Sequence, residues 1–327
     1  MKQMIVLLGA IAAMCTTAAA AEVPQSACRN HVVRVVTVTQ AGLEHSADLA
    51  DRTLARLEQS AVFHPDIACL PELFPRRGPE TIPGETTGRL AKWAREHSSY
   101  VIFGMKTASD GKVYNSAVLI DRKGNIAGEF RKMHPTEGEL AEGTAPGGTE
   151  PQVFETDFGT IGIQICFDVN WWENWKRLKQ KGASIVFFPS AYPALRQLSA
   201  LALTNQVYVV SSAGRGSSNI YDITGKVLAS SGSYQQWAGA ALPMGKRLFE
   251  VDYNAEKVRA IEQKYGPKVV VDWLHEDDWF TLASLDRDLT VNDLIAEFGL
   301  TPLDEYRARA TKAVEKARAV ARRKSVN

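Results

Sequence analysis

A cysteine closes an apolar strand in the segment IGIQICFDVN. Ile161, Ile163 and Ile165 share one face of the predicted strand, and Cys166 follows at its carboxyl end, before a helix expected over 171–181. Ligands generally bind at this end of the strands in α/β sheets, so a thiolate there would be an accessible nucleophile. A free cysteine in an apolar strand is, taken by itself, more often a small core residue. Cys166 therefore needs reactive neighbours before it indicates catalysis.

A glutamate and a lysine stand in comparable positions elsewhere in the chain. LPELF places Glu72 directly after a strand expected over 66–70, and FRKMHP places Lys132 after an apolar run that includes Phe130. Taken singly, Glu72 is typical of a helix start or a loop, and Lys132 is typical of a solvated surface. Together with Cys166, the two side chains could act on an amide or nitrile carbon.

The chemistry of this trio follows from pKa and charge. A free cysteine has a pKa of about 8.5 and is mostly protonated at neutral pH, so attack needs a base close to the sulfur. Glu72 could accept the thiol proton and return it to the leaving nitrogen. Lys132, as an ammonium, could stabilise the tetrahedral oxyanion together with a backbone N–H. Water would then release the acid from the thioester, with Glu72 again as base.

These residues occur in the order and local context of a known triad. Glu72, Lys132 and Cys166 resemble the Glu-Lys-Cys triad of the carbon-nitrogen hydrolase, or nitrilase, superfamily, and the resemblance extends over roughly residues 31–265. It implies a four-layer α-β-β-α sandwich with mixed sheets, and a reaction that uses no metal or organic cofactor. CFD at 166–168 is more similar to the amidase and carbamoylase branches than to the nitrilases proper.

The resemblance also implies a second active-site glutamate. EGTAPGG resembles the segment that carries this residue, and Glu142 is its best match. Glu137 and Glu139 lie close by, and because the interval from Lys132 varies in the superfamily, the choice among the three stays open.

Further residues are expected around the substrate. By resemblance, Phe167 contributes its backbone N–H to the oxyanion site, and FFPSAYP places Ser190 and Ala191 near the substrate. Four aromatic residues could shape either the pocket or a dimer contact. They are Trp171, Trp172, Trp175 and Tyr192.

Short β-branched runs alternate with helical patterns, which indicates an α/β sandwich around a mixed sheet. The expected strands are HVVRVVTVTQA, DIACL, YVIFGM, YNSAVLID, VFETDFGTIGIQIC, ASIVFFPS, VYVVSSA and NIYDITGKVLA. Helices are expected over 46–62, 85–97 and 171–181, and a last strand and helix over 249–266. This pattern predicts one hydrolase domain over 30–265 and a partly helical extension over 266–327.

The extension contains a long amphipathic pattern. From Leu303 to about Lys324, apolar residues recur at helical spacing with Arg and Lys between them. We expect this helix to dock on the domain or on a second subunit. Contact with an anionic membrane surface is the weaker alternative, because the apolar face is mainly alanine.

The first 21 residues have the pattern of a secretory signal. Lys2 is followed by the apolar run MIVLLGAIAAM and then by TTAAAA, whose small residues fit a cleavage site. The run is too short for a membrane span, which needs about 20 apolar residues. The segment 1–21 therefore predicts an exported protein, periplasmic or secreted, with no integral membrane segment after its removal.

Composition excludes several other classes. The chain has 327 residues, and 38 Lys and Arg stand against 37 Asp and Glu, so nucleic acid is an unexpected partner. Four cysteines without C-x-x-C spacing argue against a disulfide scaffold or a cysteine zinc site. We expect Cys28 and Cys69 to be free thiols, because parallel strands would hold them far apart.

The function predicted from these patterns is an exported, cofactor-free hydrolase. It would cleave an amide or ureido C–N bond of a small molecule through a Cys166 thioester. Nitrile hydrolysis by the same triad stays open, as does a secreted binding protein that keeps the fold without catalysis. By resemblance, the protein is expected to form a homodimer.

Overall fold

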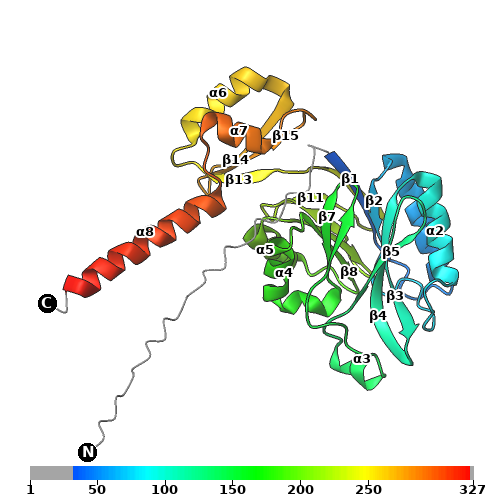
Figure 1. The fold of residues 1–327 in the computed structure, drawn as a ribbon. Coiled ribbons are helices and arrows are strands. Elements are labelled where there is room, and N and C mark those ends of the chain that lie inside the picture. Colours follow the sequence, from blue (N-terminus) through cyan, green and yellow to red (C-terminus); the bar gives the residue numbers. More distant parts are fainter. Residues whose placement is uncertain (1–31, 325–327) are drawn as a thin grey trace, which may run out of the picture.

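The computed structural model describes residues 32–324, whose main body is built on two six-stranded sheets (Figure 1). The expected export signal over 1–21 and Cys28 lie outside the described residues.

Sheet A is mixed. Its strands are β1 (Val32–Val38), β2 (Ile67–Cys69), β3 (Tyr100–Ser109), β4 (Lys112–Ile120), β5 (Ile126–Arg131) and β12 (Trp237–Pro243). They lie in the order β12-β1-β2-β3-β4-β5. β1, β2 and β3 are parallel, as the intervening helices require, whereas β12, β4 and β5 pair antiparallel with their neighbours.

Sheet B repeats this plan. Its strands are β6 (Val153–Thr156), β7 (Gly159–Ile163), β8 (Ile185–Ser190), β9 (Tyr208–Ala213), β10 (Asn219–Tyr221) and β11 (Val227–Ser230), in the order β11-β10-β9-β8-β7-β6. β7, β8 and β9 are parallel, and antiparallel strands flank them on both sides. The carboxyl ends of the parallel strands in each sheet are therefore available for a site.

Helices cover the outer face of each sheet (Figure 1). α1 (Leu49–Ser60), extended by η1 (Ala61–Phe63), and α2 (Glu85–His97) pack on sheet A, whereas α4 (Trp172–Gln180) and α5 (Leu195–Asn205) pack on sheet B. One apolar core fills the space between the sheets, including Val35, Ile102 and Phe187. These four layers confirm the expected α-β-β-α sandwich.

Two segments differ from their predicted form. VFETDFGTIGIQIC is a hairpin of β6 and β7 rather than one strand, because Gly159 has a φ of +128° and reverses the chain. NIYDITGKVLA is likewise a hairpin, turning at Gly225 with a φ of +78°. α5 was not expected, since its sequence LRQLSALALTN lies between two predicted strands.

The chain after β12 forms a smaller unit with its own apolar core (Figure 1). It contains β13 (Arg247–Glu250), α6 (Ala255–Tyr265), η3 (Gly266–Lys268), β14 (Val269–Leu274), β15 (Trp279–Ser284) and α7 (Val291–Phe298). Its sheet has the order β13-β15-β14. Phe249 of β13 and Val258 and Ile261 of α6 share the core of this unit with Phe280 and Leu294, whereas Leu248 of β13 packs in the core between the two large sheets.

α8 (Leu303–Lys324) follows and extends away from the body (Figure 1). Leu303 is buried, but from Arg307 to Arg322 every side chain is exposed. The helix forms where its periodicity predicted it. Its beginning contacts the rest of the chain, where Leu303 enters the core between the sheets and the Arg307 guanidinium lies over the Trp279 ring. Among the described residues, no helix has both the length and the hydropathy needed to cross a membrane.

Candidate active site

The candidate nucleophile lies at a turn that follows β7. The backbone is extended at Ile165, and η2 (Cys166–Asn170) begins at the next residue. Cys166 has a φ of +46°, a left-handed conformation that costs on the order of 1–3 kcal/mol for a residue with a Cβ. Asp168 helps to hold this turn, since its Oδ2 accepts a hydrogen bond from the Ile165 N–H at 3.2 Å. The Cys166 side chain lies at the edge of the core between the sheets, with 8% of the residue exposed.

Glu72 belongs to the other sheet, just past the end of β2. Pro71 has no N–H to donate, but its carbonyl accepts a hydrogen bond from the Gly104 N–H at 3.1 Å, which keeps the chain against β3 beyond the end of β2. The loop then crosses Gly104 of β3 closely: a Cβ on Gly104 would lie 2.5 Å from the Cα of Glu72. Glycine at this position therefore lets the Glu72 backbone pack against the sheet, and the Glu72 side chain is buried.

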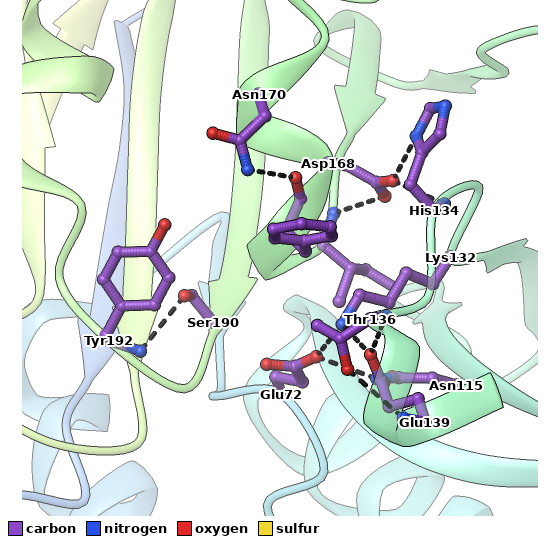
Figure 2. Close-up of polar contacts among 12 residues, drawn as sticks. Glu72, Asn115, Lys132, His134, Thr136, Glu139, Asp168, Asn170, Ser190 and Tyr192 are labelled. Carbon is purple, nitrogen blue, oxygen red and sulfur yellow. Dashed lines mark hydrogen bonds and ion pairs between the residues drawn. The ribbon is translucent and has the colours of Figure 1, made fainter. Parts of the chain in front are cut away.

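Lys132 joins two carboxylates, the buried Glu72 and the partly buried Glu139 (Figure 2). Its Nζ donates to Glu72 Oε1 at 2.8 Å and to Glu139 Oε2 at 2.8 Å. Asn115 of β4 makes a matching pair, because its Nδ2 donates to Glu72 Oε1 at 2.8 Å and to Glu139 Oε1 at 2.7 Å. These four side chains form a closed hydrogen-bonded set, which we call the carboxylate ring.

Glu139, rather than Glu142, is the glutamate in contact with Lys132. The Glu142 side chain is 69% exposed, and its carboxylate lies 3.6 Å from Lys106 Nζ. Glu137 is also exposed. The geometry therefore does not support the preference for Glu142 that the sequence suggested. It favours Glu139, one of the two alternatives left open there.

A capping box explains why Glu139 points inward. Thr136 precedes α3 (Glu137–Ala141), and its Oγ1 accepts a hydrogen bond from the Glu139 N–H at 3.2 Å. In return, Glu139 Oε2 accepts a hydrogen bond from the Thr136 N–H at 2.8 Å. This reciprocal contact turns the carboxylate back toward Lys132. The pattern T-x-x-E is visible in the sequence and would have favoured Glu139.

Asn115 was not expected at the site. It lies in YNSAVLI, a strand whose residues from Tyr114 onward are buried, and it is 1% exposed. Burying an amide costs free energy unless it is hydrogen-bonded. A polar residue inside such a strand is the signal that could have identified it.

Burial and charge keep Cys166 protonated. Burial, followed by the charge of Glu72, raises the pKa of the Cys166 thiol to about 12. Lys132, the backbone N–H of Ala191 and the Ser190 hydroxyl act in the opposite direction but do not offset these effects. At neutral pH the group at this position is therefore a thiol rather than a resting thiolate.

The ring itself holds its charges. Burial alone would lower the pKa of Lys132, but the charges of Glu72 and Cys166 and the hydrogen bonds to both glutamates raise it above its ordinary value. Burial alone would raise the pKa of Glu139, but hydrogen bonds from Lys132, a backbone N–H and Asn115 hold it below its ordinary value. Lys132 is therefore an ammonium and Glu139 a carboxylate at neutral pH.

Sheet B supplies the surroundings of the thiol. Ser190 ends β8, and its Oγ accepts a hydrogen bond from the Tyr192 N–H at 3.1 Å (Figure 2). The Ala191 N–H and the Ser190 hydroxyl lie close enough to Cys166 to lower the pKa of its thiol. Tyr192 is half-buried, and burial together with the negative charges of Glu72 and of the ionised form of Cys166 raises the pKa of its hydroxyl.

A second polar contact ties the lysine loop to the cysteine turn. His134 lies two residues after Lys132, and Asp168 lies two residues after Cys166. Asp168 Oδ1 accepts a hydrogen bond from the backbone N–H of His134 at 2.9 Å. The same oxygen lies 2.8 Å from Nδ1 of the His134 ring (Figure 2). Asp168 is fully buried. We call this contact the His134–Asp168 strap; it joins segments that follow strands of the two different sheets.

The three tryptophans near Cys166 have different environments. Trp175 is fully buried in the core between sheet B and its helices, so it lines neither a pocket nor a surface. Trp171 stacks on the His134 ring with centroids 3.5 Å apart and contacts the partly exposed Phe167 edge-on at 5.4 Å. Trp172 is 49% exposed.

Cys69 is, as predicted, a free thiol within the core. It pairs with Thr37 in the parallel register of β1 and β2, and burial raises the pKa of its thiol. No charged group of the ring reaches it, so it has the features of a structural residue.

The sequence model of the carbon-nitrogen hydrolase family matches residues 32–244. The chain belongs to this family. The match covers both sheets of the sandwich and ends before β13, so the smaller unit and α8 lie outside it.

Curated relatives of the chain include amidases. It is 31% identical over 196 residues to a deaminated glutathione amidase of Mus musculus, over 50% of this chain and 61% of that protein. It is 30% identical over 218 residues to omega-amidase NIT2 of Xenopus tropicalis, over 56% of this chain and 78% of that protein. The chain thus spans less than two thirds of the mouse protein.

Solved structures share the fold. A carbon-nitrogen hydrolase from Helicobacter pylori G27 has a TM-score of 0.58 at 19% identity, covering 72% of this chain and 94% of that chain. An amidase from Nesterenkonia sp. has a TM-score of 0.57 at 17% identity, covering 72% of this chain and 97% of that chain. At these identities the likeness concerns the fold alone.

Proposed function

We propose that the protein hydrolyses a small-molecule amide through a thioester on Cys166. The observation that carries this proposal is the carboxylate ring, in which one buried ammonium bridges the carboxylates of Glu72 and Glu139 next to a thiol on a strained turn. The similarity to an omega-amidase and to a deaminated glutathione amidase favours an amide as substrate.

Acylation begins with the thiol. Because the pKa of Cys166 is about 12, its proton must leave as the sulfur attacks the carbonyl carbon, and Glu72 accepts it. The carbonyl oxygen becomes an oxyanion. Lys132 has three hydrogens, of which Glu72 and Glu139 hold two, so the third is available to the oxyanion together with the Phe167 N–H.

Collapse of the tetrahedral species breaks the C–N bond. Glu72 returns the proton to the nitrogen, ammonia or an amine leaves, and the acyl group stays on sulfur as a thioester. Glu72 then takes a proton from water as the water attacks the thioester carbon. The acid departs and the sulfur regains its proton, so the enzyme returns to its starting state. Glu139 acts through Lys132 and is a positioning residue in this scheme.

A ureido substrate is the second candidate. A segment of the chain is 37% identical over 118 residues to a beta-ureidopropionase of Arabidopsis thaliana, although this covers only 34% of the chain and 29% of that protein. The same steps would release a carbamoyl group from Cys166, because the attacked carbon again carries a nitrogen leaving group.

Ammonia release tests the proposal. We expect the full chain to release ammonia from members of a panel of small amides, ureido acids and nitriles, and Cys166→Ala to release none. Cys69→Ala is the matched control and should keep full activity. A non-catalytic binding protein is the conclusion if no compound is hydrolysed and iodoacetamide labels Cys166 no faster than Cys69.

We also propose export and a homodimer, on the pattern of residues 1–21 and on the family resemblance. Expression with the full N-terminus should give a periplasmic or secreted protein whose sequence begins near residue 22, and a cytoplasmic protein that retains Met1 would refute export. Sedimentation equilibrium should give twice the mass of the processed chain, and a monomer mass would refute the dimer.

A further inference from the structure

Asn115 closes the carboxylate ring, but the reaction proposed above gives it no part. The residue lies on β4 and is 1% exposed. β4 lies two strands away from β2 in sheet A, so Asn115 reaches Glu72 across β3. A buried amide in this position must be explained by the groups that it contacts.

Both hydrogens of the Asn115 amide are used by the ring. An amide nitrogen carries two hydrogens, and one points to Glu72 Oε1 at 2.8 Å while the other points to Glu139 Oε1 at 2.7 Å. Hydrogen bonds to an ionised acceptor are the stronger kind, so each contact restrains a carboxylate. The amide therefore fixes the two glutamates relative to each other.

The two oxygens of Glu72 are left in different states. Oε1 accepts hydrogen bonds from both Lys132 and Asn115. Oε2 receives no hydrogen bond from any residue that the structure describes, and the charge of Glu72 acts on the Cys166 thiol. One oxygen is thus anchored, and the other is available to accept a proton.

We propose that Asn115 is a positioning residue that keeps Glu72 Oε1 on Lys132 and leaves Oε2 to the proton of Cys166. With Lys132 as its only partner, the carboxylate could rotate and present both oxygens to the ammonium. That rotation would occupy the oxygen that serves as base and would draw Lys132 away from the oxyanion. The proposal rests on the proposed role of Glu72 as base.

The ring also explains a charge effect of Asn115. Its hydrogen bond is one of the contacts that hold the pKa of Glu139 below the ordinary value. Removing the amide hydrogens therefore raises the pKa of Glu139, so that Lys132 loses its charged partner at a higher pH and the acid limb of the pH profile should move to higher pH.

Two substitutions remove these hydrogens in different ways. Asn115→Leu replaces the amide by an apolar group of similar size, and Asn115→Asp keeps the shape but offers only acceptors to the two glutamates. Ser116→Ala is the matched control, because Ser116 is the next residue of β4, is fully buried and donates to the Glu129 carboxylate at 2.7 Å, outside the ring. The control therefore removes one buried donor to a carboxylate without touching the ring.

We expect Asn115→Leu and Asn115→Asp each to lower kcat by about 10²-fold with KM nearly unchanged, because a misplaced reacting group costs about that much. The acid limb of kcat/KM should move to higher pH in Asn115→Leu. Ser116→Ala should keep the wild-type kcat, and the acid limb of its pH profile should stay where it is in the wild type. This should hold even if its Tm falls as much as that of the Asn115 variants. The proposal is overturned if either folded Asn115 variant keeps kcat within about threefold of wild type, or if Ser116→Ala matches their loss.

Alkylation gives a readout that does not need the hydrolysed substrate. At neutral pH, iodoacetamide should modify Cys166 faster in the wild-type protein than in Asn115→Leu. In the wild type, Asn115 positions Glu72 so that its carboxylate assists removal of the thiol proton. Equal rates would count against the positioning role. A wild-type protein that shows the rate difference but releases no ammonia would refute the proposed function and still support the role of Asn115.

Discussion

Sheet A and sheet B contribute to the site in different ways. The ionised groups of the carboxylate ring follow strands of sheet A: Glu72 comes after β2, and Lys132 and Glu139 come after β5. Sheet B supplies neutral groups, namely the Cys166 thiol after β7 and the Ser190 hydroxyl at the end of β8. The charges therefore satisfy one another on one side, and the proposed nucleophile faces them from the other.

This division has a physical reason. Buried charges are tolerated when each is paired and hydrogen-bonded, and Lys132 and Asn115 achieve this for two carboxylates within one sheet. A thiol needs no such pairing and can lie on the opposite sheet. The parts of the site that come from sheet A and from sheet B must then be held in a fixed position relative to each other. The His134–Asp168 strap is one contact that joins them.

The largest expected effect comes from breaking the charged half. Lys132→Met removes the proposed oxyanion donor and leaves the carboxylates of Glu72 and Glu139 without a counter-charge, so kcat/KM should fall by about 10³-fold. Ser190→Ala, on the neutral half, should cost about tenfold or less, because it removes one neutral hydroxyl. Steady-state kinetics of both variants, with Tm measured alongside, test the comparison between the two sheets. Equal losses of kcat/KM in the two variants would contradict the larger contribution of sheet A.

A smaller effect separates the two glutamates near α3. Glu139→Gln removes a charge that is hydrogen-bonded to Lys132, and kcat should fall by about 10²-fold because the ammonium loses its position. Glu142→Gln is the matched control on the same segment and should stay within about threefold of wild type, because its side chain is solvated. If Glu142→Gln shows the larger loss in kcat, the choice of Glu139 is wrong.

The strap tests how the halves are joined. His134→Leu removes the ring nitrogen that faces Asp168, and kcat should fall by about 10-fold to 10²-fold as Lys132 and Cys166 lose register. His134→Asn should restore part of the activity, because its Nδ2 can replace the ring Nδ1 as a donor to Asp168. If His134→Leu and His134→Asn have equal activity, the hydrogen bond between His134 and Asp168 does not position Lys132 and Cys166.

The last prediction concerns the pH dependence of the Cys166 thiol, the neutral group that sheet B supplies. Because burial and Glu72 raise the pKa of Cys166 to about 12, the thiolate fraction at neutral pH is small and increases with pH up to that value. In Glu72→Gln the pKa of Cys166 should lie below that of the wild type because the Glu72 charge is absent, and burial should still hold it above its ordinary value. The rate of iodoacetamide alkylation of Cys166 in this variant should rise about tenfold per pH unit between neutral pH and that pKa. Mass spectrometry of the modified peptide measures it. A rate that is already constant at neutral pH would mean a resting thiolate.

Much of the sandwich was predictable because strands and helices have different apolar periods. The helix expected over 85–97 is α2 (Glu85–His97), and the parallel pairing of β1 and β2 followed from the helix between them. The turns at Gly159 and Gly225 were missed, since a single glycine does not distinguish a strand from a hairpin. The smaller unit was also missed, because its core joins β13 to segments far along the chain.

The sequence by itself determined which chemical groups the protein has and in what order. Glu72, Lys132 and Cys166 each follow an apolar strand, and strand ends are where a side chain can leave the core. Only the tertiary structure decided which groups meet, because contacts such as Asn115 with Glu72 join different strands, and three glutamates in one short segment look alike until a helix cap turns one of them inward. Local patterns thus select the reacting groups, whereas the packing of two sheets selects their partners.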